Sequence, residues 1–171
     1  PSPTRRSSDL APEARPKLLN LFRAVSLRHD ELGQEIVLNE LLRNLLHAHL
    51  YEHAERVIST CVLQQPYRSN NQAARFFYAD ALTRAIRLDY SEAANSVQQA
   101  LRKAPERAQG FRIAATKLFL VIHLLLGEIP PRSEFLQTGM KDALAPYLQL
   151  TSCVRFGNLG RFQSICQQHM E

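Results

Sequence analysis

"YSEAANSVQQALRKAP" occupies residues 90–105, and "YEHAERVISTCVLQQP" occupies residues 51–66, 39 positions earlier. The two stretches share few identical residues, yet both space a tyrosine, a small residue, an aliphatic residue and a second small residue in the same way, and both end on proline. This spacing lies on one face of an α-helix. The positions are Tyr51, Ala54, Ile58 and Cys61 in the first stretch and Tyr90, Ala93, Val97 and Ala100 in the second.

Each of these helices follows another expected helix, over residues 35–48 and 74–87, after a turn of two or three residues. Pro66 and Pro105 end the second helices, because the residue before a proline is pushed out of the α-helical region. The sequence therefore predicts helix–turn–helix pairs that recur every 39 residues. Recurring pairs of this kind form an α-solenoid, and the unit is slightly longer than the tetratricopeptide repeat of about 34 residues.

The match to the tetratricopeptide pattern is loose. Ala93 and Ala100 occupy its small positions, and Ala81 replaces its usual glycine. Asp80 and Arg84, however, occupy positions where apolar residues are expected. We therefore describe the predicted units as tetratricopeptide-like.

The rest of the chain also favours helices. Residues 1–11 have no apolar periodicity and are expected to form a disordered or non-native tail, and Pro12 and Pro16 suit the first turn of a helix. Gly33 is expected to break the helical pattern, and no segment alternates as a strand does. The predicted fold is all-α, with further helices over residues 17–28, 110–126, a short stretch after 128, 141–156 and from 159 or 160 onward.

The composition is that of a folded chain. Of the 171 residues, 45% are hydrophobic and 22% are charged, which excludes a disordered class. The net charge of +5 permits a nucleic-acid or acidic-protein partner but does not require one, because the basic residues are spread along the chain as on solvated helix faces. Three cysteines without metal-finger spacing and the absence of a secretory segment predict a soluble intracellular chain.

No catalytic, cofactor or metal site is predicted. His49 and His53 have helical metal-ligand spacing, and His47 is near, but the expected turn at 49–51 separates them. Asp30 and Glu31 form a tight acidic pair that helix capping explains as well as acid–base chemistry does. The glycine-containing stretch 157–160 predicts a helix-to-helix turn, and His123 is interpreted as a satisfied core residue.

An RNA-binding strip is the weaker interpretation of residues 68–78. Basic residues from Arg68 to Arg75 precede Phe76, Phe77 and Tyr78, and aromatic rings beside cations can stack on bases. All three aromatics fall within one helical turn, so at least two of them are expected to face the core.

Five strings carry a family resemblance. In order they are "LRHDELGQEIVLNELLRNLL" (27–46), "RLDYSEA" (87–93), "ALRKAP" (100–105), "LLLGEIP" (124–130) and "RFGNLGRF" (155–162). Together they closely resemble the 26S proteasome non-ATPase regulatory subunit 3 family of lid scaffold subunits, from about Pro16 to about Gln168.

The resemblance implies a stack of tetratricopeptide-like helix pairs followed by a PCI module, which is a helical portion capped by a winged helix. Residues 12–127 would be the repeats and residues 128–171 the start of the PCI helical portion, so that the chain is expected to be a fragment truncated before the winged helix.

The implied function is that of a non-enzymatic scaffold of the regulatory particle lid, in the cytoplasm and nucleus, that supports ubiquitin-dependent degradation. Its expected partners are other lid subunits, with no cofactor, small-molecule substrate, nucleic acid or membrane. The alternatives are a PCI-type subunit of the COP9 signalosome or of translation initiation factor 3, or an RNA-binding helical module. An RNA-binding module predicts Lys and Arg gathered on one face of the surface.

Overall fold

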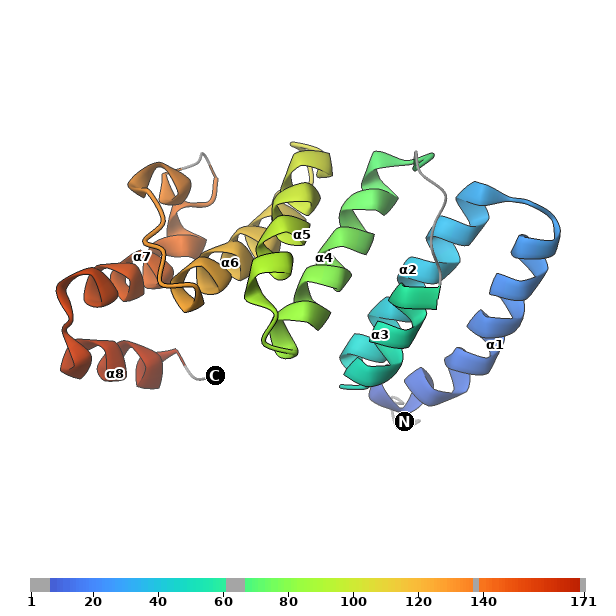
Figure 1. The fold of residues 1–171 in the computed structure, drawn as a ribbon, viewed down its shortest axis with the longest axis horizontal. Coiled ribbons are helices and arrows are strands. Elements are labelled where there is room, and N and C mark those ends of the chain that lie inside the picture. Colours follow the sequence, from blue (N-terminus) through green and yellow to red (C-terminus); the bar gives the residue numbers. More distant parts are fainter. Residues whose placement is uncertain (1–6, 61–66, 137–138, 170–171) are drawn as a thin grey trace, which may run out of the picture.

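The structure is a computed structural model that describes residues 7–60, 67–136 and 139–169. Its helices lie side by side in an elongated row, with α1 at one end and α7 and α8 at the other (Figure 1). All the regular elements in these ranges are helical, which confirms the all-α class. They are α1 (Ser7–Leu27), α2 (Glu31–His47), α3 (Tyr51–Thr60), α4 (Asn70–Ile86), α5 (Tyr90–Lys103), α6 (Gln109–Leu125), the 3₁₀ helix η1 (Arg132–Phe135), α7 (Lys141–Phe156) and α8 (Leu159–Gln168).

The 39-residue period governs the helix boundaries. α2, α4 and α6 each have 17 residues, and their first residues, Glu31, Asn70 and Gln109, stand 39 positions apart. The second helices α3 and α5 begin at Tyr51 and Tyr90 with the same offset. The predicted helix pairs and their recurrence are therefore confirmed.

The turns inside the pairs repeat as well. His49, Leu88 and Gly127 have left-handed backbones with φ of 56°, 69° and 81°. After α4, the Leu88 N–H donates to the Ala85 carbonyl at 3.1 Å and the Asp89 N–H donates to the Arg84 carbonyl at 3.0 Å. This is the Schellman arrangement that satisfies the last carbonyls of a helix. Only glycine adopts the left-handed region without strain, which costs other residues about 1 kcal/mol.

The small residues of the repeated pattern are the points of closest packing. Ala54, Ala93, Val97 and Ala100 are fully buried, and Tyr90 packs against the same cluster as Ala93 and Val97. α5 ends at Lys103, and the next residue, Ala104, is extended (ψ 129°) as expected before Pro105. The equivalent end of the earlier pair, with Cys61 and Pro66, lies outside the described residues.

A polar cluster replaces apolar packing between α4 and α5. Asp80 is buried, and it accepts hydrogen bonds from Arg84 on its own helix (2.9 Å to each carboxylate oxygen) and from the Ser96 hydroxyl of α5 (2.6 Å). This explains how Asp80 and Arg84 are tolerated where the repeat pattern expects apolar residues, because a buried charge requires a hydrogen-bonded partner. The equivalent positions in the preceding unit, 39 residues earlier, are Leu41, Leu45 and Val57.

The third unit departs from the repeat. α6 begins in register, but "IPP" at residues 129–131 stands where α3 and α5 begin. Each proline disfavours the helical conformation of the residue before it, so no helix starts there. The short η1 comes next instead, and the buried side chain of Phe135 joins Leu120 of α6 and Leu144 of α7 in a separate apolar cluster.

Two expected boundaries were wrong. α1 begins at Ser7 and so includes residues 7–11, which were expected to be a tail; a polar helix start carries no apolar periodicity by which to recognise it. Gly33 does not break the pattern, because it lies in the first turn of α2. The break is at His29 and Asp30, where Asp30 caps α2 by accepting the Gly33 N–H at 2.9 Å. A Cβ at position 33 would lie 2.4 Å from that Asp30 carboxylate, so glycine fits here for steric reasons.

Candidate functional site

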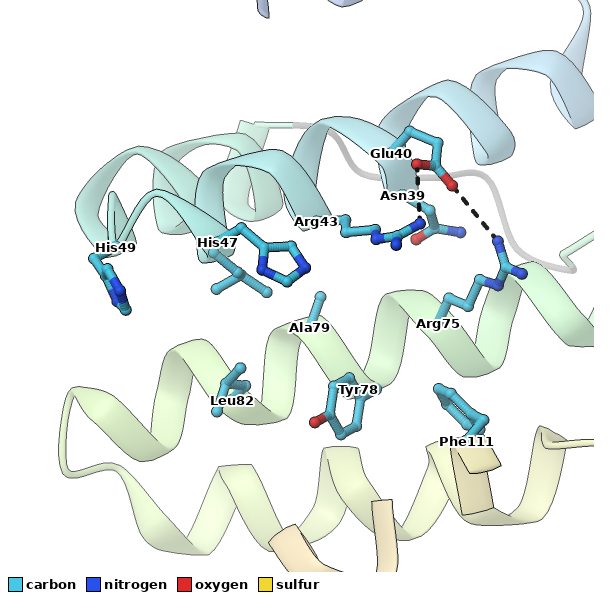
Figure 2. Close-up of a pocket in the computed structure, with 11 residues that line it drawn as sticks. Asn39, Glu40, Arg43, His47, His49, Arg75, Tyr78, Ala79, Leu82 and Phe111 are labelled. Atoms are coloured by element: carbon cyan, nitrogen blue, oxygen red, sulfur yellow. Dashed lines mark ion pairs between the residues drawn. The ribbon is translucent and has the colours of Figure 1, made fainter. Parts of the chain in front are cut away.

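A groove of about 540 Å³ lies between α2 and α4, the first helices of successive pairs. Figure 2 shows α2 forming one wall and α4 the other, with Phe111 of α6 at one end. Because α2 and α4 are repeats in the same register, they present equivalent positions to it, such as Asn39 and Tyr78. The groove is lined by Asn39, Glu40, Arg43, Leu46, His47, His49, Arg75, Tyr78, Ala79, Leu82 and Phe111.

Two buried side chains of α2 fix the start of α4. The Glu35 carboxylate accepts the backbone N–H groups of Arg68 at 2.7 Å and Ser69 at 3.2 Å. The Asn39 amide donates to both the backbone carbonyl and the side-chain oxygen of Gln72, each at 2.9 Å. The first N–H groups of a helix have no partner within it, and Glu35 supplies an acceptor at that end of α4. Together with the Asn39 contacts, it seats the start of α4 against α2.

The charged residues of the groove converge on one carboxylate. Glu40 lies 3.7 Å from Arg43 on its own helix and 3.7 Å from Arg75 on the opposite wall (Figure 2). All three side chains are exposed by 41% or more, so these ion pairs contribute little to stability. They leave guanidinium N–H groups accessible to a partner on both walls.

Two aromatic residues line the end of the groove towards α6. The rings of Tyr78 and Phe111 meet edge to face with centroids 5.5 Å apart. Burial raises the pKa of the Tyr78 hydroxyl, and the neighbouring Tyr147 adds to this rise. Tyr78 is therefore neutral at physiological pH and offers the groove an apolar ring and an uncharged hydroxyl.

The structure separates the three histidines. His47 and His49 lie in the groove wall, where His49 Nδ1 is 2.6 Å from the Tyr51 hydroxyl, whereas His53 is exposed on α3. Across the described ranges no three His, Cys, Asp or Glu side chains are grouped so that they could hold a metal ion. Cys153 is buried and Cys166 half-buried, both as free thiols, and Cys61 lies outside the described residues.

The other candidates have structural partners. Asp30 caps α2, and Glu31 forms an ion pair with Arg68 across the pair boundary. His123 is only partly buried, since 22% of its side chain is exposed; it contacts the Glu128 carboxylate and the Phe119 ring. Within residues 157–160, Asn158 caps α8 by accepting the Arg161 N–H at 3.0 Å, as expected of a helix-to-helix turn.

The aromatic residues of the 68–78 strip do not form a stacking platform. Phe76 and Phe77 pack against Tyr67 in the core, and only Tyr78 faces the groove, which confirms that at least two face inward. The cations of the strip are paired, Arg68 with Glu31 and Arg75 with Glu40.

The groove was not identified from the sequence. Arg43 and Phe111 carry no motif, and their proximity to Arg75 and Tyr78 depends on how the helices pack. The repeat period was the one available signal: Asn39 and Tyr78, and likewise Arg43 and Leu82, are 39 positions apart and line the same groove. Among the described helices, none is long and apolar enough to cross a bilayer.

Comparison with known proteins places the chain in a family. Residues 6–151 match the family described as "PSMD3-like, N-terminal TPR repeats". The probable 26S proteasome non-ATPase regulatory subunit 3 of Nicotiana tabacum is 46% identical over 162 residues, which are 95% of this chain and 33% of that protein. Homolog A of Arabidopsis thaliana is 46% identical over 97% of this chain and 34% of its own length, and the Dictyostelium discoideum protein is 42% identical over 93% and 32%.

This chain thus spans about a third of the length of these curated relatives. The family match covers the repeated helix pairs and continues through η1 into α7. The similarity to the named relatives extends over nearly the whole chain, at an identity far above that of repeats that share only a pattern. The chain therefore belongs to the 26S proteasome non-ATPase regulatory subunit 3 family, as the five strings predicted.

Proposed function

We propose that this chain is a non-catalytic scaffold segment of the 26S proteasome regulatory particle lid, which supports ubiquitin-dependent protein degradation by binding other lid subunits. The observation that carries the proposal is the groove between α2 and α4, built on repeat-related helix faces in a member of this family. Solenoids bind partners along extended surfaces of this kind.

The chemistry of the groove supports protein binding. Its walls combine apolar and aromatic side chains with two exposed arginines, and aromatic residues and arginine are enriched at protein interfaces. Arg43 and Arg75 share the single carboxylate of Glu40 and are 69% and 48% exposed, so both guanidinium groups keep N–H donors for an acidic side chain of a partner.

The domain organisation belongs to the same proposal. We assign residues 12–127 to tetratricopeptide-like pairs and residues 128–171 to the start of a PCI helical portion. The loss of the 39-residue register at residues 129–131 supports a boundary there. The proposed location is the cytoplasm and nucleus, and the proposed partners are the other lid subunits.

Affinity purification from cells tests the function. The full-length gene product is tagged, and co-purifying proteins are identified by mass spectrometry, for the unaltered protein and for an Arg43→Glu/Arg75→Glu variant. We expect the unaltered protein to recover lid subunits and the variant to recover several-fold less, because both substitutions place like charges beside Glu40.

The matched control is Arg56→Glu, since Arg56 is 71% exposed on α3, away from the groove. It should recover lid subunits as the unaltered protein does. Recovery of no proteasome subunits by the unaltered protein would overturn the proposal, and recovery of RNA in their place would favour the nucleic-acid-binding alternative.

A further inference from the structure

A second surface, distinct from the groove, lies at the turns that end the first helices α4 and α6. The α4–α5 turn and the end of α6 are neighbours at the same edge of the row of helices, because Ile122 of α6 packs with Ala81 of α4 and Ala93 of α5 (Figure 1). This edge carries exposed apolar side chains, which we call the turn-edge strip: Ile86 (40% exposed), Leu88 (71%), Leu125 (54%), Leu126 (36%) and Ile129 (43%).

One pair of the strip comes from the repeat. Ile86 and Leu125 are equivalent positions of successive units, 39 residues apart. At this position the two units contribute exposed apolar side chains at matching places. A run of exposed apolar side chains at one edge indicates an interaction surface more strongly than scattered ones do.

Leu88 is the most informative member of the strip. Its backbone is left-handed, a conformation that glycine adopts without strain and that the next unit gives to Gly127. Its side chain is largely exposed, so it gains little packing within the chain. Its exposed apolar side chain is therefore available for a contact outside the chain.

The charges around the strip are predominantly negative, although the chain as a whole is basic. Arg84 faces three carboxylates, those of Asp80, Asp89 (3.8 Å) and Glu92 (4.0 Å). The other arginine of this turn, Arg87, is paired with Glu55. Asp89 and Glu92 are exposed by 50% and 58%, so their negative charge faces outward.

The second turn of the strip adds to this negative charge. Glu128 is 63% exposed and meets only His123 among the titratable residues of 121–129. Asp80 and Glu55, which lie outside the two turns, neutralise Arg84 and Arg87. The charges that remain in residues 84–92 and 121–129 are the carboxylates of Asp89, Glu92 and Glu128.

We propose that the turn-edge strip docks a basic amphipathic helix of a partner protein. Leucine-like side chains at i, i+3, i+4 and i+7 of the partner would cover Leu88, Leu125 and Ile129. Lysines or arginines of the partner that flank this row of leucine-like side chains would face Asp89, Glu92 and Glu128. This partner chemistry is opposite to that of the groove, whose accessible charges are arginines, so the two surfaces select different ligands.

A defined synthetic helix tests the proposal with the chain of residues 1–171. The probe is a fluorescently labelled 18-residue peptide of leucine and lysine in amphipathic order, and its binding is followed by fluorescence anisotropy. Two comparison peptides have glutamate in place of lysine, or the same leucines and lysines in an order without helical periodicity. We expect the amphipathic leucine–lysine helix to bind at least about tenfold more tightly than either comparison peptide.

Substitutions then locate the binding. Leu88→Asn removes the apolar contact, and asparagine tolerates the left-handed backbone, so the fold is retained. It should weaken binding of the leucine–lysine helix by about tenfold, as expected for a leucine side chain that loses its burial. Leu125→Gln, at the end of α6, should weaken it similarly and guards against a defect particular to the α4–α5 turn.

The matched control is Leu27→Asn. Leu27 is 83% exposed and precedes the α1–α2 turn, where Arg28 is the next residue. Unchanged binding by this variant, with loss in the other two, supports the proposal. Equal binding by all four proteins, or tighter binding of the leucine–glutamate helix, would overturn it and leave the lid-scaffold proposal intact, because that proposal rests on the groove.

Discussion

Ser96 of α5 donates a 2.6 Å hydrogen bond to the buried carboxylate of Asp80 on α4. Arg84 binds the same carboxylate through both oxygens. One unit earlier the three equivalent residues are Leu41, Leu45 and Val57, which lie in or against an apolar cluster. Repeat-equivalent positions are therefore polar within the α4–α5 pair and apolar within the α2–α3 pair.

The first prediction concerns the replacement of the polar cluster by the apolar residues of the preceding unit. Asp80→Leu alone should lower the free energy of unfolding by about 2 kcal/mol, because it removes the buried partner of Arg84 and Ser96. The triple substitution Asp80→Leu, Arg84→Leu and Ser96→Val should return it to within about 1 kcal/mol of the unaltered chain, since a well-packed apolar set can replace a buried ion pair. Urea unfolding followed by circular dichroism measures both. A triple variant less stable than Asp80→Leu would contradict the prediction.

The left-handed turn residues give the second prediction. Leu88→Gly should raise the free energy of unfolding by about 0.5 kcal/mol, because relief of left-handed strain exceeds the entropy that glycine adds to the unfolded chain. Gly127→Ala should lower it by about 1 kcal/mol. A Cβ at position 127 would meet no atom within 4 Å, so the loss would come from the backbone alone. Chemical denaturation measures both free energies of unfolding. If the two substitutions both raised or both lowered this free energy, the two turns would not be equivalent.

Glu35 gives the third prediction. Glu35→Ala should cost about 2–3 kcal/mol, because the Arg68 and Ser69 N–H groups lose a charged acceptor. Glu35→Gln retains one acceptor oxygen and should cost less. Hydrogen exchange at the amides of residues 68 and 69 should accelerate in the alanine variant. The control is Glu52→Ala, since that side chain is 89% exposed, and it should change stability by under about 0.5 kcal/mol.

The Glu31–Arg68 pair gives a pH prediction. The hydrogen bond and the positive charge of Arg68 lower the pKa of the exposed Glu31 carboxyl from its ordinary value. A carboxyl with a lowered folded-state pKa contributes stability that is present above its unfolded-state pKa and is lost as the pH falls through its folded-state pKa. The small contribution of this pair should therefore be present at neutral pH and vanish in acid.

NMR titration of the Glu31 carboxyl carbon measures the effect directly. Its pKa should be lowest in the unaltered chain, higher in Arg68→Lys, which keeps the charge but not the guanidinium geometry, and highest in Arg68→Gln. Identical titration curves in the three proteins would show that the pair does not form in solution.

The fold could be predicted largely from the sequence because its information is local and repeated. Ala93, Val97 and Ala100 mark a buried helix face by spacing alone, and Pro105 marks its end. Gly33 was misleading because glycine usually disfavours helix, whereas here a Cβ would displace the Asp30 carboxylate from its capping position.

The groove could not be predicted in the same way. Glu40 and Arg75 are 35 positions apart on different helices, and no local pattern states that they meet. Their contact depends on the angle at which α4 packs on α2, which Glu35 and Asn39 fix through backbone groups. The amino-acid sequence does not show where the backbone groups of residues 68 and 72 lie in space. The contacts that Glu35 and Asn39 make with them could therefore be found only from the structure.

The two prolines after Ile129 divide the chain into a part that repeats every 39 residues and a part that does not. Whole 39-residue units could be removed or duplicated before that point and still leave every remaining interface in phase, because each unit contacts only its neighbours. Beyond it, α7 packs through Leu144 against Phe135 of η1 and Leu120 of α6. Residues 129–131 are therefore the point up to which 39-residue units could be exchanged between members of this family while the α6–η1–α7 cluster is kept whole.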